Sequence, residues 1–390
     1  MTETLDAPWM HREDIAGLTA ALGKHNARFV GGAVRDTLLD IAVKDIDMAT
    51  VLHPPEVIER LHAAGIRNVP TGIEHGTVTA VLPGGPVEIT TLRHDVSTDG
   101  RRATVAFASD WREDAARRDF TINALYADPA SGEIFDYFGG TADLEKRHVR
   151  FIGDARQRIR EDHLRILRYF RFQARFGSQP ADEEAESACE ELSATLKGLS
   201  RERVGMETMN LLGLPDPAPT VQRMAELGVL AVILPEADPE ALKALIACEQ
   251  ARGIAPDALR RLAALLPAQV PLAEQVAARF RLSGTQKKRL ATAAAREEAP
   301  GDPRALAYRL GHDGALDRLL LAGADVSALQ DWDIPAFPLK GGQIVARGVG
   351  AGPEVARTLR RIEDRWIAEG FPDEARVHAL LDEELEGRDT

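Results

Sequence analysis

Paired glycines near the N-terminus form a first motif suited to phosphate chemistry. The segment GGAVRD, residues 31–36, lies between a predicted strand at 27–30 and a predicted helix. Gly31 and Gly32 let a phosphate approach the backbone closely, and the free N–H groups of a helix N-terminus can bind it. Arg35 adds a guanidinium whose geometry fits phosphate. Most such turns bind no ligand, so the motif indicates a phosphate site only in combination with the motifs that follow.

Two carboxylates spaced two residues apart form the second motif. Asp45 and Asp47 lie in a predicted strand at 44–50, where residues i and i+2 point to the same face. Magnesium takes oxygen ligands, often one or two carboxylates plus substrate phosphates, and two such ions could activate a hydroxyl and stabilise a pyrophosphate leaving group. A solvated strand face is the alternative, which the preceding glycine turn disfavours. Glu88, on a neighbouring predicted strand, either completes the site or is an exposed strand charge.

Adjacent arginines form the third motif, RRDFTINA at residues 117–124. Arg117 and Arg118 open a predicted apolar helix and suit a triphosphate or an RNA phosphate. A surface ion-pair cluster with Asp119 is an equally good interpretation of the same residues.

The fourth motif, EDHLRILRYFR at residues 161–171, is predicted to be helical. Asp162 and Arg165 would then be i, i+3 neighbours, either as a salt bridge or as a base-reading pair. A carboxylate accepts from the exocyclic amine of cytosine or adenine while a guanidinium donates to the ring nitrogen; uracil and guanine present the reverse pattern. Each step of three turns the helix by about 300°, so Arg168 can face the site while Arg171 points away.

The elements around these motifs divide the chain into a mixed α/β N-terminal part and a helical remainder. Composition changes between residues 140 and 155, and helices are expected almost exclusively beyond Trp111. Near the C-terminus, a glycine turn at 350–352 between two predicted helices could bind an RNA phosphate or form a tight corner. The N-terminal part is predicted to contain strands at 27–30 and 44–50, a helix at 55–64, and two or three antiparallel strands within 71–93. Residues 94–110 are predicted to be a polar, mobile loop, with or without a short strand in the second half.

Composition is that of a globular protein with few cysteines. The 390 residues carry a formal charge of −13, which taken alone counts against nucleic-acid binding. Residues 141–180, however, hold ten Arg and Lys against five Asp and Glu. Cys189 and Cys248 have no metal-ligand spacing, and the sequence shows neither a signal peptide nor an apolar run able to span a bilayer. A cytoplasmic location is therefore expected, with no membrane association.

In combination, the four motifs resemble those of class II CCA-adding enzymes, which are tRNA nucleotidyltransferases related to bacterial poly(A) polymerases. The resemblance covers residues 27–176 and continues more weakly at 199–212, which is similar to the family's RNA-binding helical segment. It implies an α+β fold, with a polymerase-β-like head built on a five-stranded, mixed and mostly antiparallel sheet. Helical parts follow, so that the implied division is head 1–145, neck 146–215, and body and tail 216–390.

The resemblance also implies roles for individual residues. It makes Asp45 and Asp47 the Mg²⁺ ligands and places the family's third acidic position at Glu88. It makes Asp162 and Arg165 the pair that templates the incoming base. The candidate nucleotide-binding residues, including the two of the glycine turn, are Gly31, Gly32, Arg35, Arg118, Asp162, Arg165, Arg168 and Arg171.

The activity that the resemblance implies is template-independent addition of C, C and A to the 3′ end of tRNA. CTP and ATP would be the substrates and pyrophosphate the product. Residues 71–79 and 90–111 resemble CCA-adding enzymes, the second segment their flexible loop. A poly(A) polymerase or A-adding enzyme with the same head is the alternative. A non-enzymatic RNA-binding protein is disfavoured by the intact carboxylates, and no protein partner follows from the sequence.

Overall fold

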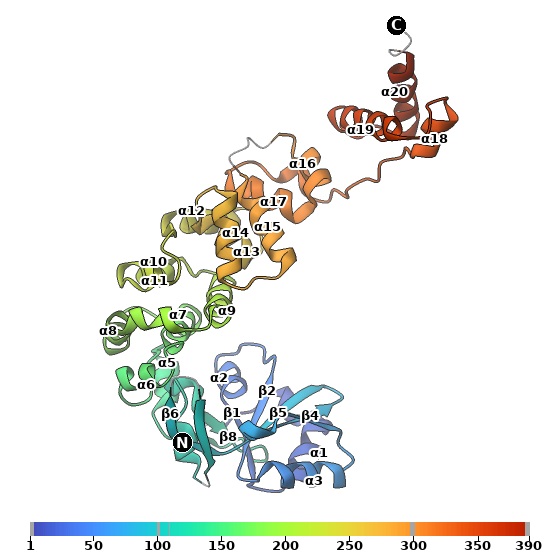
Figure 1. Cartoon of the computed structure of the whole chain (residues 1–390). Coiled ribbons are helices and arrows are strands. Elements are labelled where there is room, and N and C mark those ends of the chain that lie inside the picture. The colour runs from blue at the N-terminus through green and yellow to red at the C-terminus, as the bar shows by residue number, and fades with distance from the viewer. Residues whose placement is uncertain (1–3, 100–101, 109, 297–300, 387–390) are drawn as a thin grey trace. The chain divides into compact units, whose positions relative to one another are not determined.

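The computed structural model covers the chain and describes residues 4–99, 102–108, 110–296 and 301–386. It divides into two compact units, Met1–Pro235 and Glu236–Thr390 (Figure 1). All four motifs lie in the first unit.

A seven-stranded mixed sheet forms the head, in the order β3-β4-β5-β2-β1-β8-β9. β2 and β5 are parallel and every other neighbouring pair is antiparallel, which confirms the predicted mixed, mostly antiparallel sheet. Two short strands beyond Trp111 raise the number above the five expected. The strands are β1 (Ala27–Val30), β2 (Ile46–Thr50), β3 (Asn68–Gly72), β4 (Thr77–Leu82), β5 (Gly85–Thr91), β8 (Leu125–Ala127) and β9 (Ile134–Asp136).

The polar segment predicted to be a loop, with or without a short strand in its second half, is an antiparallel pair of strands. β6 (Arg93–Asp99) pairs with β7 (Arg102–Phe107), from Arg93 opposite Phe107 to Asp99 opposite Arg102. Polar composition suggested a loop, but ladder hydrogen bonds are made by the backbone and need no apolar side chains. Position 109 and positions 100–101 lie outside the described residues.

Along the chain, helices precede and separate the strands of the head, and they also make up the rest of the first unit after β9. α1 (Glu13–Leu22) contacts α3 (Pro54–Ala63), and their Leu18, Leu22 and Leu61 are completely buried. The remaining helices of the unit are α2 (Gly32–Leu38), α4 (Trp111–Ala116), α5 (Gly140–Glu145), α6 (Ala155–Glu161), α7 (Arg165–Phe176), α8 (Glu183–Leu192), α9 (Arg201–Leu212), α10 (Ala218–Glu226) and α11 (Val229–Ile233).

Aromatic packing fixes α7 against the head. Phe120, which precedes the 3-10 helix η3 (Thr121–Asn123), lies 4.9 Å from Phe172 of α7 between ring centroids. Phe151 stacks on Tyr169 at 5.8 Å. These rings are almost fully buried, so aromatic contact of this kind stabilises the junction beyond simple area burial. This packing therefore holds the helix that carries Arg165, Arg168 and Arg171 in place against the head.

The second unit is helical in its described residues. The glycine turn predicted near the C-terminus links α18 to α19, and Trp366 of α19 is buried in a small core with α20. Among the described residues, no helix combines the length and apolar character needed to cross a membrane. The helices are α12 (Pro239–Ala251), α13 (Ala258–Leu265), α14 (Val270–Arg279), α15 (Gly284–Ala294), α16 (Pro303–Leu310), α17 (His312–Leu321), α18 (Gly341–Ala346), α19 (Pro353–Ala368) and α20 (Glu374–Glu386).

Candidate nucleotide-binding site

A cavity of about 600 Å³ in the first unit gathers most of the predicted site residues. Its walls come from the turn after β1, from β2, from residues 117–123, and from α7 and α9. Asp45, Glu88 and Arg171 are not among its lining residues. The predicted residues that line it are Gly31, Gly32, Arg35, Asp47, Arg118, Asp162, Arg165 and Arg168.

The glycine turn at the end of β1 needs glycine at its first position. Gly31 has φ of +69°, a conformation that residues with a Cβ rarely adopt. Its N–H donates to Leu125 O at 3.0 Å, and its carbonyl accepts from Arg35 N at 3.0 Å. A side chain at Gly31 would also meet Arg118 Nη1 at 3.5 Å. The backbone conformation, rather than a lack of space, therefore favours glycine at this position.

Arg35 is buried at the junction of the head and α7. Its Nε donates to Asp36 Oδ1 at 2.8 Å, and its Nη1 donates to Asn123 Oδ1. Its guanidinium lies 4.1 Å from the ring centroid of Phe176. Burial lowers the pKa of Arg35, although the charge of Asp36 opposes the shift. Arg35 therefore lines the cavity as a pre-oriented cation.

Asp47 and Glu88 face each other across the strand pair β2–β5. The parallel register places Asp47 directly opposite Glu88, so both side chains lie on one face. Asp45 immediately precedes β2. The pKa of Asp47 is raised to about 6, first by burial and then by the charges of Glu88 and Asp45, while Arg118 opposes the shift.

This donor set fits a divalent cation. Within the described ranges, no three His, Cys, Asp or Glu side chains are grouped so that they could hold a metal on their own. Magnesium does not require such a group, because it commonly combines one or two carboxylates with phosphate oxygens and water. Crowded negative charge at Asp47 is the condition that a bound cation would relieve.

The paired arginines share one carboxylate, and it is not the expected one. Arg117 Nε donates to Asp114 Oδ1 at 3.0 Å, and Arg118 Nη2 donates to Asp114 Oδ2 at 3.1 Å. The OH of Tyr126 also donates to Asp114 Oδ2, at 2.7 Å. Although burial alone would raise it, the pKa of Asp114 is lowered to about 2 by the two arginines and Tyr126. The ion-pair cluster proposed with Asp119 was therefore wrong about its partner.

The predicted base-reading pair is not on one helix. α6 ends at Glu161, Asp162 is extended with φ of −150° and ψ of 105°, and α7 begins at Arg165. Asp162 Oδ1 accepts from Leu164 N at 3.1 Å, and its Oδ2 accepts from Arg203 Nη2 at 2.7 Å. A carboxylate that bonds a nearby N–H in this way competes with helix formation, which is why the helical prediction failed here.

Arg165 and Arg158 fasten the start of α7 to the head. Arg165 Nη1 donates to Glu161 Oε2 at 2.6 Å and to Arg158 O at 2.7 Å. Arg158 Nη2 donates to the carbonyl oxygens of Arg117 and Arg118, the second at 2.6 Å. Asp162 and Arg165 therefore line one cavity, yet each has a different ionic partner.

The last two predicted arginines diverge along α7. Arg168 lines the cavity and donates to Asp119 Oδ2 from Nε at 2.8 Å and from Nη2 at 2.5 Å. Arg171 donates from Nε to Glu207 Oε2 at 2.6 Å. Glu207 Oε1 also lies 3.7 Å from Arg168 Nη1, so one buried carboxylate of α9 serves both arginines.

Sequence reasoning missed several cavity residues. Arg203 and Glu207 lie four residues apart on α9, a spacing that places two side chains on one helix face. That spacing could have indicated that they belong to one site. Met206, between them, is 53% exposed and lines the cavity. Asp119 and Asn123 belong to the third motif, but nothing in that motif alone predicts their contacts with α7 and Arg35.

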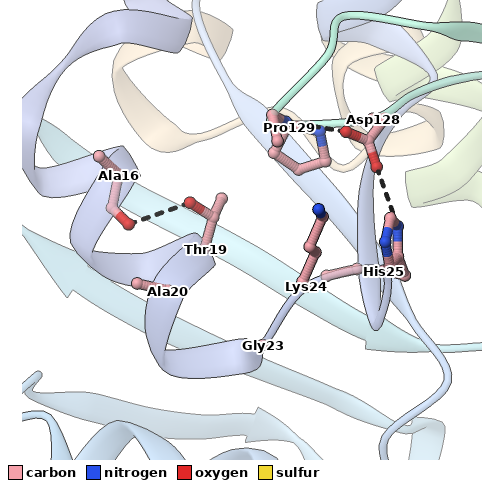
Figure 2. A pocket seen from close by; sticks show the side chains of 10 residues that line it. Ala16, Thr19, Ala20, Gly23, Lys24, His25, Asp128 and Pro129 are labelled. Atoms are coloured by element: carbon pink, nitrogen blue, oxygen red, sulfur yellow. Dashed lines mark hydrogen bonds and ion pairs between the residues drawn. The ribbon is translucent and has the colours of Figure 1, made fainter.

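A second, smaller cavity of about 190 Å³ lies at the other end of β1, beside Ala27. Figure 2 shows Lys24, His25 and Asp128 around it. Asp128 Oδ1 accepts from the N–H groups of Ala130 and Ser131, both at 2.9 Å, and its Oδ2 lies 3.9 Å from His25 Nδ1. These contacts organise a surface turn.

Comparison with known protein families gives two matches. The model described as "Poly A polymerase head domain" matches residues 27–150. The model described as "Probable RNA and SrmB-binding site of polymerase A" matches residues 181–240, which include α9. Both matches fall within the first unit except for the last residues of the second.

Individual relatives extend the similarity over nearly the whole chain. CCA tRNA nucleotidyltransferase 1, mitochondrial, from Mus musculus is 34% identical over 92% of this chain and 87% of its own. The Homo sapiens protein of the same name has the same identity and coverage. The crystal structure of the Bacillus stearothermophilus CCA-adding enzyme in complex with CTP is 26% identical, with a TM-score of 0.74 over 98% of this chain and 99% of that one.

These similarities agree with the cavity and with the sheet that carries its carboxylates. Nucleotidyltransferases of this kind generally use divalent metal ions, which the donor set around Asp47 fits. With one third of its residues identical over nearly all of both chains, this nucleotidyltransferase belongs to the CCA tRNA nucleotidyltransferase family.

Proposed function

We propose that this chain adds C, C and A, without a nucleic-acid template, to the 3′ end of tRNA. CTP and ATP are the substrates and pyrophosphate is released. The observation that carries the proposal is the single cavity in which Asp47, Arg118 and Asp162 meet. It combines groups for a metal, a triphosphate and a base, and relatives over most of the chain are named CCA tRNA nucleotidyltransferases.

We further propose that Mg²⁺ is the cation, held by Asp45 and Asp47 with Glu88 close by. When bound, Mg²⁺ supplies charge that activates the attacking 3′-hydroxyl and stabilises the departing pyrophosphate. The chain's own part is positioning and charge neutralisation. Arg35 and Arg118 orient the triphosphate against the turn at Gly31 and Gly32, supported by the contacts that already hold both guanidinium groups in place.

Base choice is proposed to rest on Asp162 and Arg165. The carboxylate of Asp162 accepts from the exocyclic amine of cytosine or adenine, and Arg165 donates to the neighbouring ring nitrogen. Arg203 holds Asp162 in place, while Arg165 must turn one N–H from its present acceptors toward the base. Arg168 and Arg171 belong near the nucleotide in this scheme, Arg171 through its pairing with Glu207.

The tRNA partner is expected to contact basic surfaces outside the cavity. In the second unit, Lys287 and Lys288 of α15 and Arg318 of α17 line a cavity of about 420 Å³, together with Glu274 of α14, which lies 4.0 Å from Lys287. Residues 279–289 contain five Arg and Lys and no acidic residue. We keep the division into head 1–145, neck 146–215, and body and tail 216–390, and a cytoplasmic location, as parts of the same proposal.

The test is incubation of the purified chain and Mg²⁺ with tRNA that lacks its CCA end, giving each nucleotide separately and then CTP with ATP. Two additions with CTP and one further addition with ATP are expected. Unchanged tRNA length would refute the proposal, and long A tracts on generic RNA without use of CTP would identify a poly(A) polymerase. Asp47→Ala should abolish transfer while tRNA binding persists.

A further inference from the structure

A continuous set of hydrogen bonds runs from the glycine turn to α7 through one amide. Arg35 Nη1 donates to Asn123 Oδ1, and Asn123 Nδ2 donates to Asp119 Oδ1 at 3.0 Å. On its other oxygen, Asp119 accepts from Arg168 Nε at 2.8 Å. Arg35, on the phosphate side, and Arg168 of α7, which lines the same cavity, are thus joined by two intervening side chains.

Asn123 has the chemistry that this position requires. Arg35, on one side of Asn123, can only donate hydrogen bonds, and ionised Asp119, on the other side, can only accept them. An amide side chain can bond to both neighbours at once, because its oxygen accepts from Arg35 and its N–H₂ donates to Asp119. Asn123 and Asp119 are 9% and 8% exposed, so water is a poor substitute for either bond. An aspartate here could accept from Arg35 but would face Asp119 without a proton to donate.

We propose that Asn123 is a positioning residue that couples the triphosphate subsite at Arg35 to the base-reading helix α7 at Arg168. A triphosphate that draws Arg35 toward the cavity changes the bond to Asn123, and that change reaches Arg168 through Asp119. A base that displaces Arg168 acts in the opposite direction. Coupling between two sites is reciprocal, so correct base pairing with the protein should tighten phosphate binding. The inference rests on the proposed nucleotide site.

A second polar link between the head and α7 provides a matched control. Arg175 Nη2 lies 3.5 Å from Asp36 Oδ2, and Arg175 does not line the cavity. Asp36 is itself the ion-pair partner of Arg35. Arg175→Gln therefore removes one contact between α2 and α7 while leaving the bonds of Asn123 intact. If mere attachment of α7 mattered, this variant should behave like one at Asn123.

The test is a double-mutant cycle measured by titration calorimetry of CTP and of pyrophosphate in the presence of Mg²⁺. Arg35→Lys and Arg168→Lys are made singly and together, in the natural chain, in Asn123→Ala and in Arg175→Gln. The combined effect on the CTP dissociation constant should depart from the product of the single effects by about 2-fold to 30-fold. That departure should persist in Arg175→Gln and disappear in Asn123→Ala.

Equal non-additivity in the natural and Asn123→Ala backgrounds would overturn the inference, as would its loss in Arg175→Gln. If Asn123→Ala does not fold, Asn123→Asp keeps the volume and the bond to Arg35 but loses the donor, and the same loss of coupling is expected. Pyrophosphate, which has no base, should show little departure from additivity in any background, and a departure as large as that for CTP would also overturn the inference. Because the cycle measures binding, it is independent of CCA addition: failure of the natural chain to extend tRNA would refute the proposed function alone.

Discussion

Replacement of Asp162 by asparagine should change which bases the chain accepts. Both carboxylate oxygens of Asp162 are already used, one by Leu164 N at 3.1 Å and the other by Arg203 Nη2 at 2.7 Å. An amide has one acceptor oxygen, so Asp162→Asn can keep one of these bonds and must turn an N–H₂ toward the other donor. The charge-assisted bond to Arg203 is the stronger one and should be retained.

The size of the effect follows from the hydrogen bonds that each base makes. A bond to a charged group contributes about 1.5–3 kcal/mol and a neutral one about 0.5–1.5 kcal/mol, so cytosine should lose about 1–2 kcal/mol. Uracil offers a carbonyl where cytosine has its amine, and an amide N–H can donate to it. That neutral bond contributes about 0.5–1.5 kcal/mol, so discrimination between CTP and UTP should fall by about 1.5–3.5 kcal/mol in all, which is roughly 10-fold to 400-fold.

The assay is single-nucleotide incorporation on tRNA lacking its CCA end, with kcat/KM measured separately for CTP and UTP. Asp154→Asn is a matched control: Asp154 caps α6 by accepting from Gln157 N at 2.7 Å, and it lies outside the cavity lining. The control should leave the CTP to UTP ratio unchanged. A ratio for Asp162→Asn within about threefold of the natural chain, less than 1 kcal/mol, would show that Asp162 does not read the base.

Three further outcomes are expected. Glu88→Gln should raise the Mg²⁺ concentration for half-maximal transfer, because it removes a charge opposite Asp47, whereas an unchanged magnesium titration would place Glu88 outside the site. The folded-state pKa of Asp114, about 2, lies below its ordinary value, so its ionised form adds about 2 kcal/mol to the free energy of unfolding above pH 4. This contribution is lost as the pH falls from about 4 to 2. The free energy of unfolding measured against pH should show this loss, and Asp114→Asn should lack it. Lys287→Glu with Lys288→Glu should weaken tRNA binding and reduce the slope of log K against log salt by about 2, with CTP affinity unchanged; an unaltered slope would remove this surface from the RNA contact.

Local periodicity predicted much of the head correctly. The short apolar run at 27–30 and the alternation at 44–50 correspond to β1 and β2, and the β-branched stretch after residue 71 contains β4 and β5. In each case burial on one or both faces produces the pattern that the sequence displays. Pairing of β6 with β7 was missed because backbone hydrogen bonds leave no such trace in a polar segment.

Side-chain partners in the cavity could not be predicted in the same way. Arg203 and Asp162 are 41 residues apart, and Arg168 and Asp119 are 49 apart. Their meeting depends on how α7 and α9 pack on the head, which no local pattern encodes. The break at Asp162 involves a local bond from Leu164 N and a distant one from Arg203, and only the distant one depends on folding. The motifs therefore indicated which residues gather, but not which pairs they form.

The bonds from Arg158 to the carbonyl oxygens of Arg117 and Arg118 limit how the pocket can change size. A movement of α6 and α7 together away from residues 117–120 would have to break them along with the packing of Phe120 on Phe172, and such a movement would be costly. A purine nevertheless occupies more space than a pyrimidine. The extra room must then come from side chains at the rim, and the unbranched, exposed thioether of Met206 can change rotamer at little cost. A change of rotamer at Met206 would thus let the same cavity accept either nucleotide without a movement of the backbone.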